Sequence, residues 1–306
     1  MRQNTRRPHV ASYEGRPLVR PDEEVVDQGL GFDVVTLMSR RQMLRALGFG
    51  VVAVGLAACG SGTGSSSSNS SSSSAATSAG SSATGEIPEE TAGPYPGDGS
   101  NGPDVLEQSG IVRSDIRSSF GASSGTAEGV PMDLELVIQD LANGGTPFAG
   151  VAVYVWHCDR EGRYSMYSDG AEDQNYLRGV QVADAEGRVR FTSIFPACYD
   201  GRWPHIHFEV YHDEGSIADV TNVLATSQVA LPEDVSTQVY AQEGYESSVQ
   251  NLSQVSLDSD GVFSDDGGAS QLATVTGDVS SGLSVSLAVG VDTTTQPGSS
   301  GRGPRG

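Results

Sequence analysis

The sequence predicts one all-β domain, a sandwich or a barrel, between residues 87 and 294. Short segments in which apolar and polar residues alternate recur through this region, and glycine-rich turns separate them. Low-complexity stretches remove both ends of the 306-residue chain from the foldable part. Roughly 200 residues remain, which is enough for one all-β domain with a sizeable core.

Six segments have the alternation or the flanking turns of β-strands. In the first of them, leucine and isoleucine alternate with polar neighbours, as in a half-buried strand. The sequence DAEG at 184–187 predicts a β-hairpin between the third and fourth strands. A helix is predicted only over 232–250, which is rich in glutamine, glutamate and alanine. The predicted strands are 133–141, 150–156, 180–182, 189–194, 205–211 and 283–291.

Residues 1–59 are predicted to be a disordered leader that ends in an export signal. The sequence SRRQML at 39–44 is typical of a twin-arginine signal, and 46–58 is an uncharged, mostly apolar run too short to span a bilayer. The LAAC sequence at the end of this run resembles the lipobox of bacterial lipoproteins, in which Cys59 would be acylated. We therefore expect an exported, extracytoplasmic protein that is anchored to the membrane only through a lipid on Cys59.

The chain on either side of the predicted domain has a low-complexity composition. Residues 60–86 are almost entirely serine, glycine, alanine and threonine, which predicts a flexible linker. Residues 295–306 are predicted to be a disordered tail. Translation could start at Met1 or at Met38, which directly precedes the twin-arginine motif, and the sequence leaves both open.

The charge and the cysteines limit the classes of function. The formal net charge is −21, and all 18 basic residues are arginines, eight of which precede Cys59. An acidic surface repels phosphate backbones, so a nucleic-acid partner is not expected. Cys158 and Cys198 could form a disulfide in an oxidising compartment or stay two buried thiols, and the sequence favours neither.

Two of the five histidines stand in the sequence HIH at 205–207. Residues i and i+2 of a strand point to one face, so His205 and His207 would project together while Ile206 faces the opposite layer. Two imidazoles at this spacing are suited to hold a metal ion. The pair alone is weak evidence, and the interpretation depends on the sequence around it.

Three stretches around the histidine pair carry a family resemblance. They are VWHCDREGRY at 155–164, YLRGVQ at 176–181 and PACYDGRWPHIHF at 196–208. In order, spacing and residue type they resemble the intradiol ring-cleavage dioxygenases, among them protocatechuate 3,4-dioxygenase, catechol 1,2-dioxygenase and their exported relatives. The resemblance extends over about 91–232 and implies a β-sandwich of the intradiol dioxygenase type.

The resemblance implies that a ferric ion, Fe(III), is held by Tyr164, Tyr199, His205 and His207. Phenolate and imidazole are good iron ligands, and bound Fe(III) would lower a tyrosine pKa from its usual value of about 10. Two phenolates and one hydroxide balance the three positive charges, so the buried site needs no other counter-ion. Zinc more often takes cysteine, histidine or carboxylate, and non-haem Fe(II) oxygenases take two histidines and a carboxylate.

The resemblance also assigns residues to the substrate. Arg202 matches an arginine that stabilises developing charge, and Gln228 matches a glutamine near the substrate. Trp156 matches an aromatic residue of the pocket wall. Tyr95, in the sequence GPY, matches a tyrosine that borders the pocket.

Three further residues near these motifs are expected to be structural. His157 follows Trp156 and would point away from the pocket wall on an alternating strand. Arg163 and Arg178 are expected to be salt-bridge partners rather than substrate clamps.

The implied reaction joins a catechol-type substrate with O2. The catechol would displace the hydroxide and the Tyr199 phenolate, and cleavage between its two hydroxylated carbons would give a cis,cis-muconate-type diacid. Arg202 would stabilise the anionic state. Two other functions stay open, namely a lipid-anchored β-sandwich binding module that kept the fold but lost catalysis, and a different metalloenzyme, such as a hydrolase. Classical catechol dioxygenases have a helical dimerisation domain where this chain has its linker, so no oligomeric state is predicted.

Overall fold

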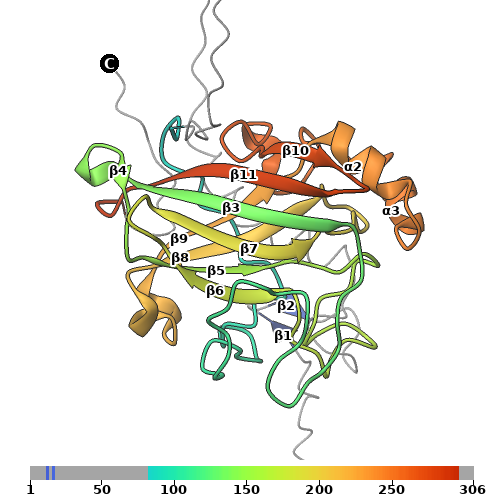
Figure 1. Ribbon diagram of the computed structural model, residues 1–306, viewed down its shortest axis with the longest axis horizontal. Helices are drawn as coiled ribbons and strands as arrows, with labels where there is room; N and C mark the ends of the chain where they lie inside the picture. Colours follow the sequence, from blue (N-terminus) through green and yellow to red (C-terminus); the bar gives the residue numbers. More distant parts are fainter. Residues whose placement is uncertain (1–11, 14–15, 18–81, 296–306) are drawn as a thin grey trace, which may run out of the picture. The chain divides into compact units, whose positions relative to one another are not determined.

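The structure is a computed structural model that describes residues 12–13, 16–17 and 82–295 (Figure 1). It divides into two units, Met1–Ala79 and Gly80–Gly306. In the first unit the described residues are strands β1 (Ser12–Tyr13) and β2 (Arg16–Pro17), which pair in antiparallel fashion.

The predicted export signal and Cys59 lie outside the described residues, as do most of the linker and of the tail. The boundaries given to these segments therefore stay predictions. Within the described ranges, no helix combines the length and the apolar character that crossing a membrane requires.

The first sheet of the second unit is built on strand β3 (Pro131–Asp140). Strand β11 (Gly282–Val291) lies parallel along one side of β3, and β10 (Thr274–Asp278) pairs with β11 in antiparallel fashion. Strands β7 (Arg188–Ile194) and β4 (Thr146–Pro147) both pair with β3 in antiparallel fashion. Burial alternates along β3, so one face of this sheet is open and the other faces the core.

The second sheet is antiparallel throughout and has the order β6-β5-β8-β9. Its strands are β6 (Arg178–Val182), β5 (Ala152–Trp156), β8 (His205–Tyr211) and β9 (Val223–Ala230). The two sheets form two layers (Figure 1). All seven residues of β8 are buried, so both faces of this strand are covered.

One apolar core lies between the sheets, and its central side chains have almost no exposed surface. Burying each of them contributes on the order of 1.5–3 kcal/mol. They come from alternate positions of the facing strands and include Leu134, Leu136, Ile138, Val153, Val155, Phe191, Ile206, Phe208, Val210, Val285 and Val289. The predicted β-sandwich is confirmed.

A second apolar cluster covers the outer face of the β6-β5-β8-β9 sheet. Val105, Leu106 and Ile111, from the segment before β3, join Tyr154 and Trp156 of β5 in this cluster. The outer side chains of β5 and β8 are therefore enclosed between the sheet and this covering segment, away from bulk solvent.

The predicted helix over 232–250 is divided into two short helices, α2 (Glu233–Tyr240) and α3 (Glu246–Leu252). Gly244 separates them with a φ of +91°, a backbone conformation that glycine adopts without strain. A Cβ atom at this position would lie 2.5 Å from Nε of Arg160, which also favours glycine here.

The predicted hairpin between 180–182 and 189–194 is wrong. β6 pairs with β5, whereas β7 pairs with β3, so the turn at 184–187 carries the chain from one sheet to the other. The Ile138 amide of β3 donates to the Gly187 carbonyl at 2.7 Å and ties the turn to the first sheet. The turn signal was real, but it could not identify the partner of each strand. Strands β4, β9 and β10 were not predicted.

Candidate metal centre and active site

Strand β8 places the two histidines of the HIH sequence side by side. His205 and His207 lie on the outer face of the sheet, while Ile206 points into the core between the sheets. The Nε2 atoms of the two imidazoles are 3.1 Å apart. The strand alternation predicted from the sequence is confirmed.

Two loops bring Tyr164 and Tyr199 to the same point. Tyr164 follows β5, and Tyr199 lies in the loop between β7 and β8. The Tyr164 hydroxyl oxygen is 3.4 Å from Nε2 of His205, and the Tyr199 hydroxyl oxygen is 3.2 Å from the same atom. Two phenol oxygens and two imidazole nitrogens from distant parts of the sequence therefore converge.

The His205 ring is oriented by the backbone. A carbonyl oxygen can only accept, so Nδ1 of His205 donates to the Trp203 carbonyl and Nε2 is left with a lone pair directed at the cluster. Burial lowers the pKa of His205 and of His207 well below the ordinary value, and the Arg202 charge acts in the same direction. Burial therefore favours the neutral imidazole, which is the form that binds metals.

The two phenols need a cation to ionise. Burial raises the pKa of Tyr164 well above its ordinary value and that of Tyr199 to about 12. In residues 82–295 no group of three or more histidine, cysteine or carboxylate side chains is placed to hold a metal ion. A metal at this cluster would thus take phenol oxygens as ligands, and a trivalent cation that favours phenolate fits this donor set.

Aromatic rings enclose the cluster. Trp156 is fully buried and stacks on the His207 ring with centroids 4.9 Å apart and an interplanar angle of 6°. Tyr95 packs on the Tyr164 ring at 4.9 Å. Both residues therefore contact predicted metal ligands, and their predicted contact with a substrate stays a prediction.

Arg202 and Gln228 lie together at the edge of the cluster. Nη1 of Arg202 is 3.5 Å from Nε2 of His205. Nη2 of Arg202 donates to Oε1 of Gln228 at 2.6 Å, and Nε2 of Gln228 donates to the Thr91 carbonyl at 3.0 Å. Gln228 therefore connects the arginine to the segment that carries Tyr95.

Asp260 was not predicted from the sequence. Its side chain is fully buried and accepts from Nε of Arg202 at 2.9 Å. Asp260 lies far along the chain from the three motifs, in a segment without strand periodicity or a recognisable motif. Only the fold brings it to the cluster.

The prediction that Arg178 is a salt-bridge partner is wrong. Among the described residues no carboxylate lies within ion-pair distance of its buried guanidinium. Its N–H groups instead donate to five neutral acceptors, which replace the hydration that burial removes. These acceptors are the carbonyls of Tyr95, Pro96 and Ser165 and the hydroxyls of Tyr154 and Ser165.

Three other predictions on nearby residues can be compared with the structure. Arg163 forms ion pairs with Asp159 at 2.9 Å and Glu161 at 3.0 Å, as predicted. His157 is buried outside the cluster and bonds to the Ser193 hydroxyl at 2.7 Å, which agrees with a structural role. Of the two alternatives for the cysteines, a disulfide or two buried thiols, the structure has the second: Cys158 and Cys198 are both free and buried.

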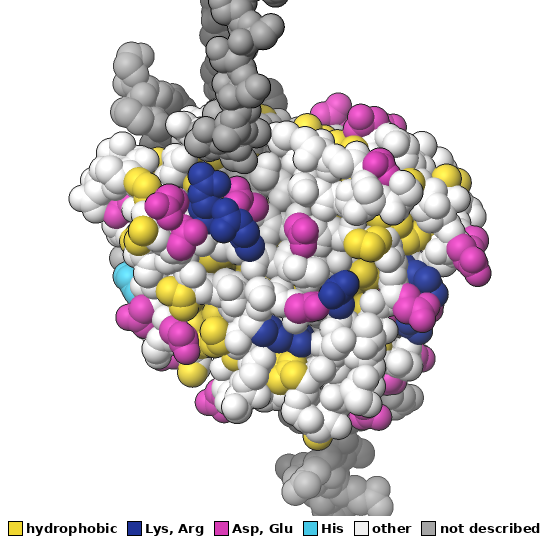
Figure 2. Space-filling model, in the orientation of Figure 1, with side chains coloured by type: hydrophobic (Ala, Val, Ile, Leu, Met, Phe, Trp, Pro, Cys, Tyr) yellow, Lys and Arg dark blue, Asp and Glu magenta, His cyan; other side chains and the backbone are white. Residues whose placement is uncertain are grey.

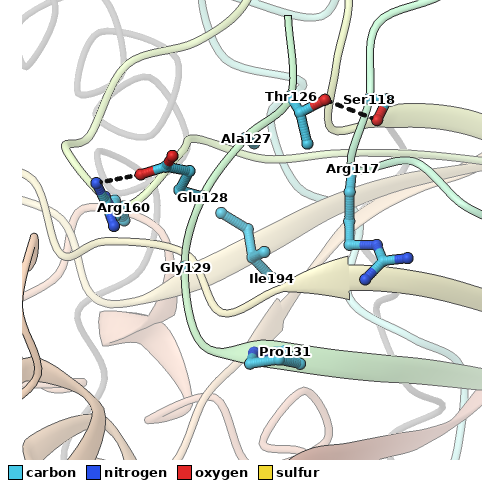
Figure 3. Close-up of a pocket in the computed structure, with 9 residues that line it drawn as sticks. All are labelled: Arg117, Ser118, Thr126, Ala127, Glu128, Gly129, Pro131, Arg160 and Ile194. Carbon is cyan, nitrogen blue, oxygen red and sulfur yellow. Dashed lines mark hydrogen bonds and ion pairs between the residues drawn. The ribbon is translucent and has the colours of Figure 1, made fainter.

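A surface pocket, drawn in Figure 3, has none of the cluster residues in its lining. Its two arginines are already paired, Arg160 with Glu128 at 2.7 Å and Arg117 with Asp115 at 2.6 Å. We therefore do not assign it as the active site. The pocket is lined by Arg117, Ser118, Thr126, Ala127, Glu128, Gly129, Pro131, Arg160 and Ile194.

On the face in Figure 2, acidic side chains are scattered among arginine and apolar ones rather than gathered in one patch.

Comparisons with known sequences agree with the geometry. Residues 101–216 match a family model described as Dioxygenase. Chlorocatechol 1,2-dioxygenase of Rhodococcus opacus is 41% identical over 56 residues, which are 18% of this chain and 22% of that protein. The protocatechuate 3,4-dioxygenase beta chain of Burkholderia cepacia is 36% identical over 98 residues, 28% of this chain and 42% of that one. The chain thus spans less than half the length of each of these curated relatives.

A solved structure extends the likeness to nearly the whole domain. The intradiol ring-cleavage dioxygenase from Tetranychus urticae has 25% sequence identity and a TM-score of 0.55. The match covers 70% of this chain and 98% of that one. Fold, family match and relatives all support membership of the intradiol ring-cleavage dioxygenase family.

Proposed function

We propose that the domain holds Fe(III) through Tyr164, Tyr199, His205 and His207 and cleaves a catechol-type ring with O2 between its hydroxylated carbons. The product would be a cis,cis-muconate-type diacid. The observation that carries this proposal is the convergence of two phenol oxygens and a second imidazole nitrogen within 3.1–3.4 Å of Nε2 of His205. The names of the relatives, which refer to catechol, chlorocatechol and protocatechuate, support this substrate class.

The two phenols differ in their freedom to act on a substrate. Fe(III) at the site would supply Lewis acidity toward the two catechol oxygens and would accept electron density from the ring. Tyr164 is only 2% exposed and packs against Tyr95, so it is fixed as a ligand. Tyr199 is half-buried on a loop, so its oxygen is the better placed to take a proton from a catechol hydroxyl.

Arg202 would stabilise negative charge, and the aromatic residues would exclude water from the site. Nη1 of Arg202 faces the cluster and would stabilise negative charge that develops on the substrate. Gln228 holds the other terminal nitrogen of this guanidinium. Trp156 and Tyr95 would exclude water on the side where they pack against the ligands, which strengthens each of these electrostatic interactions.

The test of this function uses the full chain loaded with iron. We expect bound iron, a visible band from tyrosinate on Fe(III) that shifts on addition of catechol, and O2 uptake with catechol. Tyr164→Phe and Tyr199→Phe should each alter the band and lower turnover by about 100-fold or more, because each removes an anionic ligand. Tyr240→Phe is the matched control, since Tyr240 is a buried tyrosine that bonds to the Pro196 carbonyl away from the cluster.

Two results would contradict the proposal in different ways. A folded, colourless protein that binds no iron would favour the binding module that lost catalysis. A protein that binds a metal but consumes no O2 with any catechol would favour another metalloenzyme, such as a hydrolase.

The predicted export signal supports a proposed location. Twin-arginine export carries folded proteins, which suits a metal that is loaded before export. We expect the protein outside the cytoplasm, tethered through a lipidated Cys59. Cys59→Ser should move it from the detergent phase to the aqueous phase in a detergent partition. A wild-type protein found in the aqueous phase would contradict the anchor.

A further inference from the structure

The Arg202 guanidinium is held on two sides and directed on the third. Nε donates to Oδ2 of Asp260 at 2.9 Å, and Nη2 donates to Oε1 of Gln228 at 2.6 Å. Nη1 is left facing Nε2 of His205 at 3.5 Å. An arginine side chain has several freely rotating bonds, and fixing two of its nitrogens determines where the third one points.

Asp260 is itself fixed by the backbone. Its carboxylate accepts from the amide of Trp203 at 2.7 Å, from that of Val262 at 2.8 Å and from that of Phe263 at 3.1 Å. Its side chain has 0% exposed surface, so water does not compete for these bonds. A buried carboxylate with three backbone donors and one guanidinium is fully satisfied and held in place.

These bonds connect the segment around Asp260 to the residues just before β8, which are distant in the sequence. Asp260 contacts both Arg202 and the neighbouring Trp203, which lie just before the HIH strand. Asp260 itself lies outside the matched family segment 101–216. The Trp203 carbonyl in turn accepts from Nδ1 of His205. One carboxylate therefore fixes the residue that orients a metal ligand and the residue that faces the substrate side.

We propose that Asp260 is a positioning residue for ring cleavage, because its carboxylate fixes the Arg202 guanidinium with Nη1 directed at the tyrosine and histidine side chains of the candidate metal site. This inference rests on the proposed function. Asp260 would not touch the substrate and would act through Arg202. A misplacement of about 1 Å in such a group can cost about 100-fold in rate.

The activity test compares two aspartates of the same segment. Asp260→Asn keeps the shape but removes the charge and leaves one acceptor oxygen, which cannot serve both Arg202 Nε with the Trp203 amide and the amides of Val262 and Phe263. We expect kcat with catechol to fall about 30-fold and KM to change less than about 3-fold, because the lost interaction belongs to the transition state. The exposed Asp258 supplies the control, and Asp258→Asn should change neither constant more than about 2-fold.

A double-mutant cycle separates positioning from a general loss of structure. In an Arg202→Ala background, Asp260→Asn should change kcat less than about 3-fold, because the group through which it acts is gone. Equal losses in both backgrounds would overturn the inference. The melting temperature of each variant shows whether the proteins compared are folded.

A second readout depends neither on iron nor on turnover. In the metal-free full chain labelled with 15N-arginine, the Arg202 Nε–H should give a signal protected from solvent exchange, assigned by its absence in Arg202→Ala. Asp260→Asn should abolish the protection, and Asp258→Asn should keep it. An unprotected signal in the wild type would overturn the inference even if the enzyme is active. A wild type without dioxygenase activity would overturn the proposed function, and with it the role in the reaction, whatever the signal shows.

Discussion

The two sheets of the sandwich differ in what lies on their outer faces. On β3 the outward positions are exposed or partly exposed and carry ordinary surface residues, such as Glu135 with its arginine partners. On β8 the outward positions are His205, His207, Glu209 and Tyr211, and all are buried. The same strand alternation thus produces a solvated face on one sheet and an enclosed polar face on the other.

Burying the polar side chains of the enclosed face removes them from water, which costs free energy. The polar side chains of the open face stay hydrated and have no such cost. Burial raises the pKa of Glu209 to about 8, and the pKa values of both cluster histidines fall. Polar groups are retained in such a place when other groups satisfy them or when they bind a ligand. The difference between the sheets therefore marks the outer face of the second sheet as the candidate functional face on physical grounds.

The largest expected effect comes from replacing Arg178 of β6. This residue donates to the carbonyls of Tyr95 and Pro96, and so ties the segment that covers the outer face of the second sheet, called the cover below, to that sheet. Arg178→Met keeps the apolar stem but removes the guanidinium that donates to five acceptors, most of them buried. We expect the free energy of unfolding to fall on the order of 3–5 kcal/mol, measured by urea denaturation. Arg117→Met is the control, because Arg117 and its partner Asp115 are 41% and 53% exposed, and their ion pair should contribute about 1 kcal/mol or less. Equal losses in the two variants would mean that Arg178 does not hold the cover.

A histidine on the other side of the sheet sharpens the comparison. Nε2 of His157 bonds to Ser193 of the opposite sheet, and burial lowers the pKa of His157 to about 4. The unfolded chain takes up this proton near pH 6.5, so this contribution to stability is complete above pH 6.5 and is lost as the pH falls toward 4.

The loss between pH 7 and pH 4.5 should be about 2–3 kcal/mol larger in the wild type than in His157→Asn, which has no proton to gain. Urea denaturation at the two pH values measures it. If both proteins lose the same free energy, His157 is not the neutral, buried group described here.

The sequence predicted the residues of the enclosed face better than the residues that enclose it. His205 and His207 were predictable because strand alternation is local, and Tyr164 and Tyr199 because they stand in recognisable motifs. Asp260 and the partners of Arg178 were not predictable, because they depend on which loops meet across the sheet. A buried arginine with only neutral acceptors also contradicts the usual expectation of a carboxylate partner.

The strands show the same division. β8 begins and ends where its alternation predicts, and β3 and β11 differ from prediction by only a few residues. The wrong hairpin at 184–187 shows what local pattern leaves out. A tight turn looks the same in sequence whether the next strand pairs with the last one or crosses to the other layer.

A smaller effect is expected from loosening the cover without removing it. The Tyr167 hydroxyl accepts from the Gly97 amide at 2.8 Å and donates to Oδ1 of Asn101 at 2.9 Å. Tyr167→Phe should lower the free energy of unfolding by about 1 kcal/mol and raise KM for catechol severalfold, because the segment that carries Tyr95 loses an anchor. Tyr176→Phe removes a hydroxyl that bonds to Asp159 instead, and should cost similar stability without changing KM. An unchanged KM in Tyr167→Phe would separate this segment from the substrate.

The smallest effect is expected on the open face. Glu135 occupies an outward position of β3 and pairs with Arg188 at 3.0 Å and Arg190 at 2.7 Å. Partly exposed ion pairs contribute little, because solvent and salt screen them, so Glu135→Ala should cost about 1 kcal/mol or less, and less still in high salt. Turnover with catechol should stay within about 2-fold of the wild type, since Glu135 lies on the open face of the first sheet and the cluster lies on β8 of the second sheet. A large loss of activity in Glu135→Ala would mean that the open sheet also bears on the reaction, and that burial alone does not mark the functional face.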